Sequence, residues 1–381
     1  MKILLVGEYS RLHNSLKEGL LKNGHQVTLI GNGDVFKKYP VDINIDGSFI
    51  KGNFFLNKIR HLIFKITTID LASIETFIRF KKNKKHLVDY DFVQLINEAP
   101  FNIGSYFEKK LLSFLFQYNK NVFVLACGDD YRYITYLLSG KFPYSTVSPL
   151  LDNPSLKKEY KDTLKFVTKK QKTIHDFVFN RIQGVIPASV EYSIAYKDTS
   201  KTLPLIPNPV NVDQINPILT ATDKKIKILH GINSANYIKK GNRYFEEALA
   251  IISQKYPDKI EIITTKDLSY TQYIKHFQSA QIILDQAHAH DQGYNALEAM
   301  AMEKVVFTGA GSAFSKYYNL DNIVAIDTSP DSTKIAEKLE YLILNPLEIV
   351  KIGKRARAFI EKEHHYIKIA KKYEETWKNH S

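Results

Sequence analysis

Residues 285–309, DQAHAHDQGYNALEAMAMEKVVFTG, form the stretch that decides the fold. A strand is expected over residues 282–285, and a glycine-containing loop follows it. A helix is then expected over residues 295–302 and a second strand over Val305–Thr308. This order is typical of a doubly wound parallel α/β sheet, in which ligands bind outside the carboxyl ends of the strands.

The start of this helix has the features of an anion-binding site. The first backbone N–H groups of a helix lack intrahelical partners and favour a diphosphate. Glu298 is a carboxylate that can accept hydrogen bonds from a ribose diol. Asn295 and Glu298 also have the spacing of a capping box, so Glu298 could instead only satisfy the helix end. The residues that we expect to bind the diphosphate are Gly293, Tyr294, Asn295 and Ala296.

Outward from this stretch, the same alternation of strands and helices fills the chain. Residues 202–211, TLPLIPNPVN, hold three prolines and can be neither a helix interior nor a central strand, so they predict an interdomain linker. We expect one Rossmann-like domain over residues 1–205 and a second over residues 206–363. The last helix, within residues 364–381, has an apolar face that we expect to pack back on the first domain.

The opening strand of the first domain ends at Gly7, which raises the question of dinucleotide binding. The dinucleotide fingerprint needs three glycines so that the backbone can approach a pyrophosphate, and the second and third are missing here. Asp34 lies near the position of a ribose-binding acid. The missing glycines nevertheless disfavour an NAD- or FAD-dependent oxidoreductase.

Composition narrows the classes of protein further. The 53 basic and 40 acidic residues give a net charge of +13, which favours contact with phosphates, anionic lipid or nucleic acid. The single Cys127 cannot form an intrachain disulfide, so a reducing compartment fits. No stretch reaches the roughly 20 apolar residues that span a bilayer, and the first apolar run is too short for a secretory signal. We therefore expect a cytoplasmic protein that is not an integral membrane protein.

Three short stretches resemble the GT-B glycosyltransferases, particularly glycosyltransferase family 4. The segment from Gly293 to Gly309 looks like the donor-binding segment of that family, which carries E-x7-E followed by A-M-A. Glu298 matches the second glutamate, which binds the nucleotide ribose in the family. The first glutamate falls on His290, with Asp291 beside it, so the residue that meets the donor sugar stays open between these two.

The other two stretches resemble the linker and the diphosphate-binding loop of the family. The linker segment IPNPV is similar to the family's interdomain segment. Lys240 and Gly241 look like the family's K-G, whose lysine neutralises the diphosphate leaving group. The arginine usual several residues earlier is missing, and Arg243 is a possible substitute. We include Gly231, at the start of the loop that leads to Lys240, among the donor-binding residues.

The resemblance implies a GT-B architecture, in which two Rossmann-like domains face each other across a cleft. It also implies a transferase that uses a UDP- or GDP-sugar as substrate, without a bound metal or other cofactor. Family 4 enzymes retain the configuration of the sugar, so retention is favoured over inversion. The histidines at positions 288 and 290 are expected to cap or line a cleft rather than to bind a metal.

The acceptor side is expected on loops of the first domain. Residues 127–130, CGDD, resemble the family's H-G-S-D loop, with cysteine in place of histidine. Asp130, and less favourably Asp129 or Glu98, could orient or deprotonate an acceptor hydroxyl, although an aspartate in such a turn often only caps a helix. The cleft residues expected from the first loop are Tyr9, Ser10 and His13, with His13 as a capping or solvated residue in the alternative.

Two basic and aromatic stretches bear on the partner. Residues 54–66 and 79–86 combine lysines with apolar side chains and could rest on an anionic membrane surface, which would suit a lipid-linked acceptor. Residues 157–172 are also rich in lysine, and a solvated face is the simpler interpretation there. The inner face of the membrane is therefore a candidate location.

These patterns favour a metal-independent glycosyltransferase that moves a sugar from a nucleotide sugar to a saccharide or lipid-linked saccharide, in polysaccharide or glycolipid biosynthesis. A sugar-nucleotide epimerase of the same fold is one alternative, and a non-catalytic nucleotide or carbohydrate binder is another. A nucleic-acid-binding protein would suit the charge, but no recognised binding module is present, so we expect no nucleic-acid partner.

Overall fold

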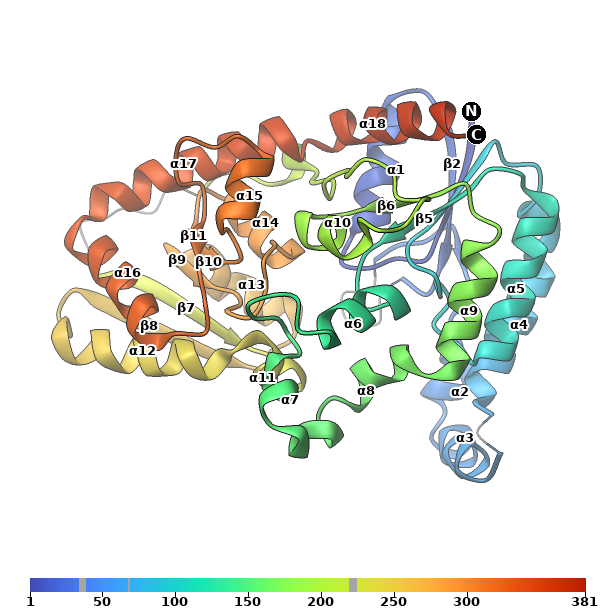
Figure 1. The fold of residues 1–381 in the computed structure, drawn as a ribbon, viewed down its shortest axis with the longest axis horizontal. Helices are drawn as coiled ribbons and strands as arrows, with labels where there is room; N and C mark the ends of the chain where they lie inside the picture. Colours follow the sequence, from blue (N-terminus) through green and yellow to red (C-terminus); the bar gives the residue numbers. More distant parts are fainter. Residues whose placement is uncertain (34–38, 68, 219–224) are drawn as a thin grey trace.

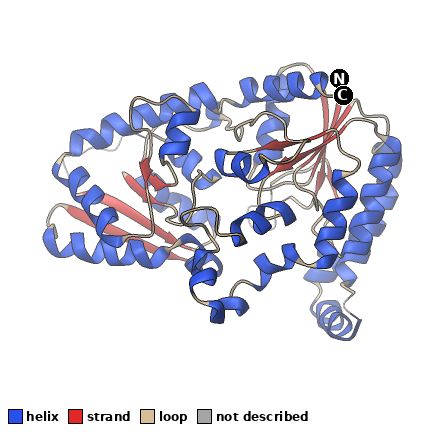
Figure 2. Ribbon diagram, in the orientation of Figure 1, coloured by secondary structure: helices blue, strands red, loops and turns tan. Residues whose placement is uncertain are grey.

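The computed structural model describes residues 1–33, 39–67, 69–218 and 225–381, so Asp34 lies outside the described residues. The chain folds into two α/β halves, each built on one parallel sheet with helices around it (Figures 1 and 2). This arrangement confirms the expected tandem of Rossmann-like domains.

The first sheet has six parallel strands in the order β3-β2-β1-β4-β5-β6. Its central strands are apolar throughout because helices cover both faces. In β1, Ile3 and Leu5 pack against helix α1, while Leu4 and Val6 point to the other face and pack with α4, α5 and α9. The strands are β1 Lys2–Val6, β2 Gln26–Gly31, β3 Ile43–Asn44, β4 Phe92–Leu95, β5 Val122–Ala126 and β6 Gly184–Pro187.

The helices of the first half differ in how deeply they are buried. Most of the longer ones cover the sheet, whereas α2 and α3 project from its lower end as drawn in Figure 1. The helices are α1 Leu12–Lys22, α2 Ser48–Gly52, α3 Phe54–Thr67, α4 Leu71–Asn83, α5 Ser105–Tyr118, α6 Tyr131–Leu138, α7 Ser148–Asp152, α8 Lys161–Leu164, α9 Lys169–Phe179 and α10 Val190–Tyr196.

The second sheet has five parallel strands in the order β11-β10-β9-β7-β8. The strands are β7 Ile226–Ile232, β8 Ile260–Lys266, β9 Ile282–Leu284, β10 Val305–Thr308 and β11 Ile326–Asp327. The helices around it are α11 Tyr237–Lys240, α12 Asn242–Lys255, α13 Tyr270–Ser279, α14 Tyr294–Ala301, α15 Ser312–Tyr317, α16 Ser332–Leu344 and α17 Pro346–Glu363. The helix expected over residues 295–302 thus begins and ends one residue earlier.

The final helix, α18 (Tyr366–Asn379), returns to the first half and packs against α1, which confirms the expectation for this helix (Figure 1). Trp377 is fully buried, stacks on Phe92 with ring centroids 5.7 Å apart, and donates its indole N–H to Gln94 Oε1 over 3.0 Å. Burial of such an aromatic side chain fixes the helix to the sheet.

The two chain crossings between the halves are hydrogen-bonded to each other. The backbone N–H of Val210 donates to the carbonyl of His364 over 2.7 Å, and the N–H of Tyr366 donates to the carbonyl of Val210 over 3.1 Å. Arg357 of α17 donates to the carbonyls of Val212 and Ile215 and so fastens the linker to the second half. The domain boundaries at 205/206 and 363/364 stay predictions.

Candidate functional site

The start of α14 differs from the capping box that the sequence allowed. The helix begins at Tyr294 after Gly293, and no side chain of the described residues caps it. Asn295 is the second helical residue, and its side-chain amide donates to Asp285 Oδ1 over 3.3 Å. Glu298 lies in the second turn, so the capping-box interpretation of Asn295 and Glu298 is wrong. The first backbone N–H groups of α14 are left without intrahelical acceptors, as at any helix start.

Lys240 lies next to this helix start. It is the last residue of α11, and Gly241 follows it with φ at +71°, a conformation that glycine adopts without strain. The ammonium group is 3.0 Å from Oδ1 of the buried Asp285, the same oxygen that Asn295 contacts. Asp285 Oδ2 accepts a further bond from Thr308 Oγ1 over 3.2 Å. A half-exposed cation and the positive end of a helix dipole therefore lie side by side.

Tyr273 of α13 completes this cluster, and our reading of the sequence missed it. Its hydroxyl donates to Asn295 Oδ1 over 3.1 Å. Gly231 makes the approach possible, because a Cβ at that position would lie 2.7 Å from the Tyr273 ring. Gly231 therefore serves packing at the end of β7. Burial, together with the charges of Asp285 and Glu298, raises the pKa of Tyr273 above its usual value, so this hydroxyl is a donor at neutral pH.

Glu298 lies in a separate cavity of about 290 Å³ between the two halves. The cavity is lined by Arg11 and Ser15 of the first half, the linker residues Asn211 and Gln214, and Tyr270 and Glu298 of the second half. Burial, with the nearby charge of Glu298, raises the pKa of Tyr270 to about 12. Arg11 has φ at +77° and contacts Glu18 and Gln214 at 2.7 and 2.6 Å. A carboxylate, an arginine and an amide thus surround a space of small-ligand size.

The side chain of Tyr294 joins the two halves and borders the 290 Å³ cavity, whereas that of Ala296 is enclosed in the second half. The Tyr294 hydroxyl donates to the carbonyl of Pro209 over 2.8 Å, and its ring packs into the core of the first half with Ile206 and Tyr373. Ala296 is fully buried in the core of the second half. The expectation for Tyr294 and Ala296 concerned their backbone N–H groups, which this side-chain packing does not test, so it stays a prediction. Only the backbone N–H groups of the two residues remain candidates, beside the exposed Gly293.

His290 and Asp291 also contact the first half. The His290 ring stacks on Phe142 and Tyr144 with centroids 4.9 and 4.4 Å apart, and its Nε2 lies 2.8 Å from the carbonyl of Tyr144. Asp291 Oδ2 accepts a bond from Ser189 Oγ over 2.7 Å. Burial is the main cause that raises the pKa of Asp291 to about 7, and the negative charge of Glu191 adds to it. His290 is therefore held by aromatic packing, whereas burial favours the neutral form of the Asp291 carboxyl.

Arg243 does not join Lys240. It lies in the first turn of α12 with a side chain 67% exposed, pairs with Glu247 one turn later at 3.2 Å, and stacks over Tyr244. The ammonium of Lys240 and the guanidinium of Arg243 thus have different partners. This geometry does not support the expectation that Arg243 replaces the missing arginine at the diphosphate.

Asp130 and Glu98 are occupied by bonds within the first half. Asp130 caps α6, with Oδ1 accepting from the N–H of Tyr133 and Oδ2 from the hydroxyl of Tyr196, each over 2.7 Å. Burial is the main cause that raises the pKa of Asp130 to about 8, and the negative charge of Glu98 adds to it. The buried Glu98 accepts from Gln171 and pairs with His175 at 2.7 Å. The helix-capping interpretation of Asp130 is confirmed, and its carboxylate does not face an acceptor.

Asp129 and Tyr9 do line an open space. A cavity of about 930 Å³ lies off the carboxyl ends of β1, β4 and β5, and Tyr9, Asn97, Gly128 and Asp129 form its inner wall. Lys239 of α11 lines it from the second half. Burial raises the pKa of Asp129, and the charges of Lys239 and Lys165 oppose that effect. Ser10 follows Tyr9 with φ at +51° and does not line this cavity.

His13 is not a cleft residue. Its ring is fully buried, Nδ1 lies 2.7 Å from the carbonyl of Gly7, and Nε2 has no hydrogen-bond partner among the described residues. Burial lowers the pKa of His13 to about 3, so the ring is neutral. The expectation that His13 faces the acceptor is therefore wrong, and the ring instead supports the turn after β1.

No three histidine, cysteine, aspartate or glutamate side chains among the described residues are arranged to hold a metal ion. Within the same residues, no helix combines the length and the apolar character that crossing a bilayer requires.

Residues 235–375 match a family model described as "Glycosyl transferase-like". This stretch contains Lys240, Asp285, Tyr273 and the whole of α14, and it amounts to less than half of the chain. No curated protein matches the sequence.

Solved glycosyltransferase structures resemble the whole chain. Sucrose-phosphate synthase from Thermosynechococcus elongatus matches with 13% identity and a TM-score of 0.57, over 100% of this chain and 98% of that one. HepE from Anabaena, solved with UDP and glucose, matches with 11% identity and a TM-score of 0.56, over 100% of both chains. A glycosyltransferase from Rickettsia africae matches with 16% identity and a TM-score of 0.52, over 99% of this chain and 97% of that one.

At these identities the likeness concerns the fold, and membership of family 4 stays a prediction. The architecture is nevertheless clear from coverage of both halves, the cavities between them and the returning helix α18. The chain therefore has the GT-B architecture of glycosyltransferases, and its second half carries a stretch similar to the "Glycosyl transferase-like" family.

Proposed function

We propose that this protein transfers a sugar from a nucleotide-sugar donor, with UDP- or GDP-sugars as the first candidates, to a saccharide or a lipid-linked saccharide. The observation that carries the proposal is the position of Lys240 beside the first turn of α14. The match of residues 235–375 to a glycosyl transferase-like model supports it, since that stretch contains both features.

The chemistry follows from the charge that develops in the reaction. When the glycosidic bond to the nucleotide breaks, the leaving diphosphate gains negative charge. Lys240 and the N–H groups at residues 293–296 would stabilise that charge, with Asp285 and Tyr273 holding Lys240 and Asn295 in place. Such fixed positive charge can serve the leaving group without a metal ion, and we propose metal-independent transfer with retention of configuration.

Glu298 is our candidate for the nucleoside. Its cavity of about 290 Å³ is bordered by Arg11 of the first half and by the amides of Asn211 and Gln214 in the linker, and a carboxylate there can accept bonds from both ribose hydroxyls. Structures of HepE from Anabaena contain UDP or UDP-glucose, and this favours testing UDP first.

Asp129 replaces Asp130 as our candidate for the acceptor side. Asp129 lines the 930 Å³ cavity, whereas both oxygens of Asp130 bond within the first half. A partly buried carboxylate with a raised pKa can orient or accept a proton from an acceptor hydroxyl. Asp291, across the domain contact, remains a candidate for the hydroxyls of the donor sugar.

The experiment is a turnover assay with UDP-glucose, UDP-N-acetylglucosamine and GDP-mannose, each with and without a panel of aryl glycosides as acceptors. We expect the rate of nucleoside diphosphate release to increase with the acceptor concentration, and a glycosylated acceptor to form. Release that needs no acceptor and yields a free epimeric sugar would favour the epimerase. Binding of a nucleotide without release of product from any donor would favour the non-catalytic binder.

A further inference from the structure

Helix α3 carries an apolar stripe that the described part of the chain leaves exposed. Phe55, Ile59, Leu62 and Ile66 recur at spacings of four, three and four and lie on one face of the helix. Their side chains are 74%, 47%, 60% and 73% exposed, and in this fully described helix no residue is buried. A helix in a globular protein normally buries such a stripe, so this one is suited to contact something outside the chain.

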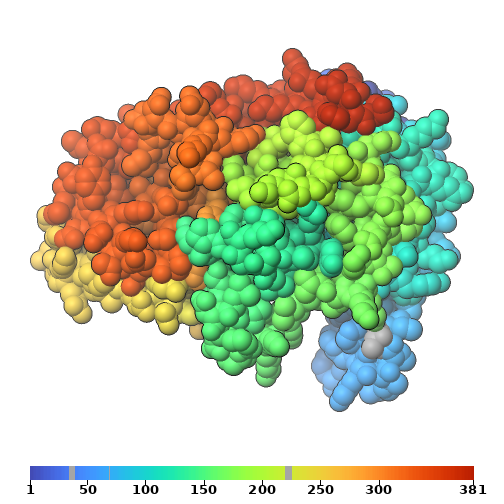
Figure 3. Space-filling model, viewed as in Figure 1, coloured from blue at the N-terminus to red at the C-terminus, as the bar shows by residue number. Residues whose placement is uncertain are grey.

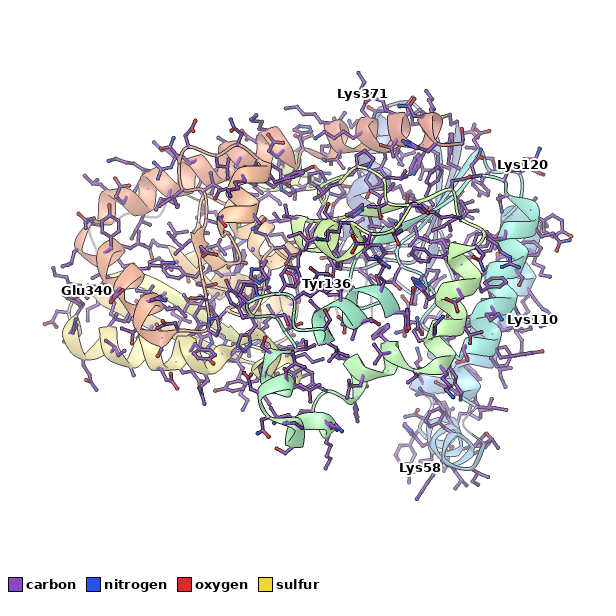
Figure 4. All side chains as sticks on the ribbon, in the orientation of Figure 1. Lys58, Lys110, Lys120, Tyr136, Glu340 and Lys371 are labelled. Atoms are coloured by element: carbon purple, nitrogen blue, oxygen red, sulfur yellow. The ribbon has the colours of Figure 1, made fainter. Side chains whose placement is uncertain are left out.

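The opposite side of α3 fixes the helix to the protein. Arg60 forms two hydrogen bonds to Asp70, at 2.6 and 2.8 Å, and Asp70 caps α4 by accepting from the N–H of Ala72. Lys58 places its ammonium 4.3 Å from the Phe54 ring. The space-filling view shows residues 48–67 standing out from the body, and Lys58 lies on this projection (Figures 3 and 4). The stripe is therefore presented outward by a defined anchor.

A strongly cationic segment lies across from α3. Residues 157–172 contain seven lysines and two acids, Glu159 and Asp162, and all seven lysines are exposed. In Figure 3 the green lobe around α7 and the blue α3 project from the same side of the molecule with a notch between them, and Figure 1 shows α8, within the lysine-rich segment, running from this lobe toward α9. Lysines beside an exposed apolar face are the combination that binds anionic lipid, because the apolar groups enter the bilayer while the ammonium groups meet headgroup phosphates.

The 930 Å³ cavity opens between these two elements. Phe64 and Ile69 line it from the side of α3, and Lys165, Phe166 and Lys170 line it from the lysine-rich segment. At about 100° per residue Phe64 projects from the side of α3 opposite the stripe, near Arg60, so α3 borders the cavity with one side and turns the stripe away from it.

We propose that α3 and residues 157–172 together dock this protein on an anionic lipid bilayer, which places the 930 Å³ cavity between these two elements close to the bilayer surface. This step rests on the proposed function, in which the cavity holds the acceptor. Docking then places the cavity next to an acceptor that is anchored in the bilayer. A second copy of the chain is a poorer occupant, because pairing these faces would bring two lysine-rich segments together.

The experiment is co-sedimentation of the full chain, without nucleotide, with vesicles of phosphatidylglycerol and phosphatidylcholine. We expect binding that weakens at high salt. Phe55→Ser/Leu62→Ser should lower the partition coefficient roughly tenfold or more, since less apolar area enters the bilayer. Lys157→Gln/Lys158→Gln/Lys161→Gln should lower it by a similar factor on these vesicles.

A matched control removes exposed apolar groups from the other half. Leu344 and Leu347 are 49% and 69% exposed on α16 and α17, and Leu344→Ser/Leu347→Ser should bind vesicles as the wild type does. Phe55→Trp gives a direct readout, because the natural Trp377 is buried. Its emission should shift to shorter wavelength on vesicles, whereas that of Leu347→Trp should not.

Several outcomes would overturn the proposal. The first is that the wild-type protein stays in the supernatant with vesicles. The second is that Phe55→Ser/Leu62→Ser binds vesicles as tightly as the wild type. The third is that the wild type is a dimer and Phe55→Ser/Leu62→Ser is a monomer. The last result would assign the stripe to a protein interface. Because vesicle binding is measured without nucleotide and nucleotide binding without vesicles, failure of docking and failure of the transferase proposal are distinguishable.

Discussion

The polar residues at the carboxyl ends of the strands have different hydrogen-bond partners in the two halves. In the first half, Asp130 and Glu98 follow β5 and β4, and their oxygens are taken by tyrosine, glutamine and histidine groups of the same half. In the second half, Lys240 and Asn295 meet at Asp285 beside an uncapped helix start. The same position in two similar sheets therefore holds helices together in one half, and in the other brings a lysine and an asparagine to one buried carboxylate beside a helix start.

The largest effect expected from this difference is on Lys240. Lys240→Ala should lower kcat/KM for donor turnover about 10²–10³-fold, because a fixed charge aimed at the leaving group is lost. Steady-state kinetics with the donor found to turn over measures this. Lys240→Arg, which keeps the charge, should recover part of the activity. A loss of less than about threefold in Lys240→Ala would remove Lys240 from the leaving-group role.

Lys240→Ala also leaves the buried Asp285 without its cation, so its thermal midpoint must be measured first. Assays well below that midpoint separate lost chemistry from lost folding.

Asp130 should show the opposite behaviour, with an effect on stability rather than on turnover. Asp130→Ala removes the cap of α6 and leaves the buried Tyr196 hydroxyl without an acceptor, which we expect to cost about 2–3 kcal/mol in the free energy of unfolding. Urea unfolding measures this, and nucleotide affinity should not change. If the variant keeps its stability and loses turnover, Asp130 acts in catalysis and the contrast between the halves fails.

The pH dependence of stability sharpens the same point. The pKa of Asp130 is about 8 in the folded protein and about 3.9 in an unfolded chain, so between these values the folded state holds a proton that the unfolded state has lost. The free energy of unfolding of the wild type, relative to Asp130→Asn, should therefore fall as the pH rises from about 4 to about 8. A difference that is constant across this range would show that Asp130 is ionised in the fold.

Arg243 gives the smallest expected effect. Because its side chain is in solvent, and its contacts with Glu247 and Tyr244 lie on the surface of α12, Arg243→Ala should change stability by less than about 0.5 kcal/mol. Its nucleotide affinity, measured by titration calorimetry, should stay within about twofold of the wild type, which makes it a matched control for Lys240→Ala. A large loss of affinity would place a second cation in the diphosphate site.

The fold could be predicted because its signals are local. The apolar runs that became β1, β5 and β10 and the stripe of Tyr373 and Trp377 on α18 depend on periodicity, which the sequence carries directly. The packing of α18 on the first half could also be predicted, because the apolar face of this helix needs a surface to bury against.

The site was only partly predictable because its contacts join distant residues. Tyr273 reaches Asn295 across 22 positions, and Tyr294 enters a core built by the other half. His13 has the residue type of a site but lies behind the turn after β1, and side-chain chemistry alone does not distinguish such a buried ring from one in a cleft. The helix start was predicted from the glycine-containing loop before it, and Lys240 from the resemblance of Lys240 and Gly241 to the K-G of the glycosyltransferase family.

The most direct test of the account is a thermal-shift titration with UDP, GDP, ADP and CMP on the wild type, Glu298→Ala and Arg243→Ala. A ligand that binds only the folded state raises the midpoint. We predict that UDP or GDP stabilises the wild type and Arg243→Ala, and that the shift shrinks in Glu298→Ala. No shift with any nucleotide at millimolar concentration, or an equal shift in Glu298→Ala, would contradict a nucleotide-sugar site at α14.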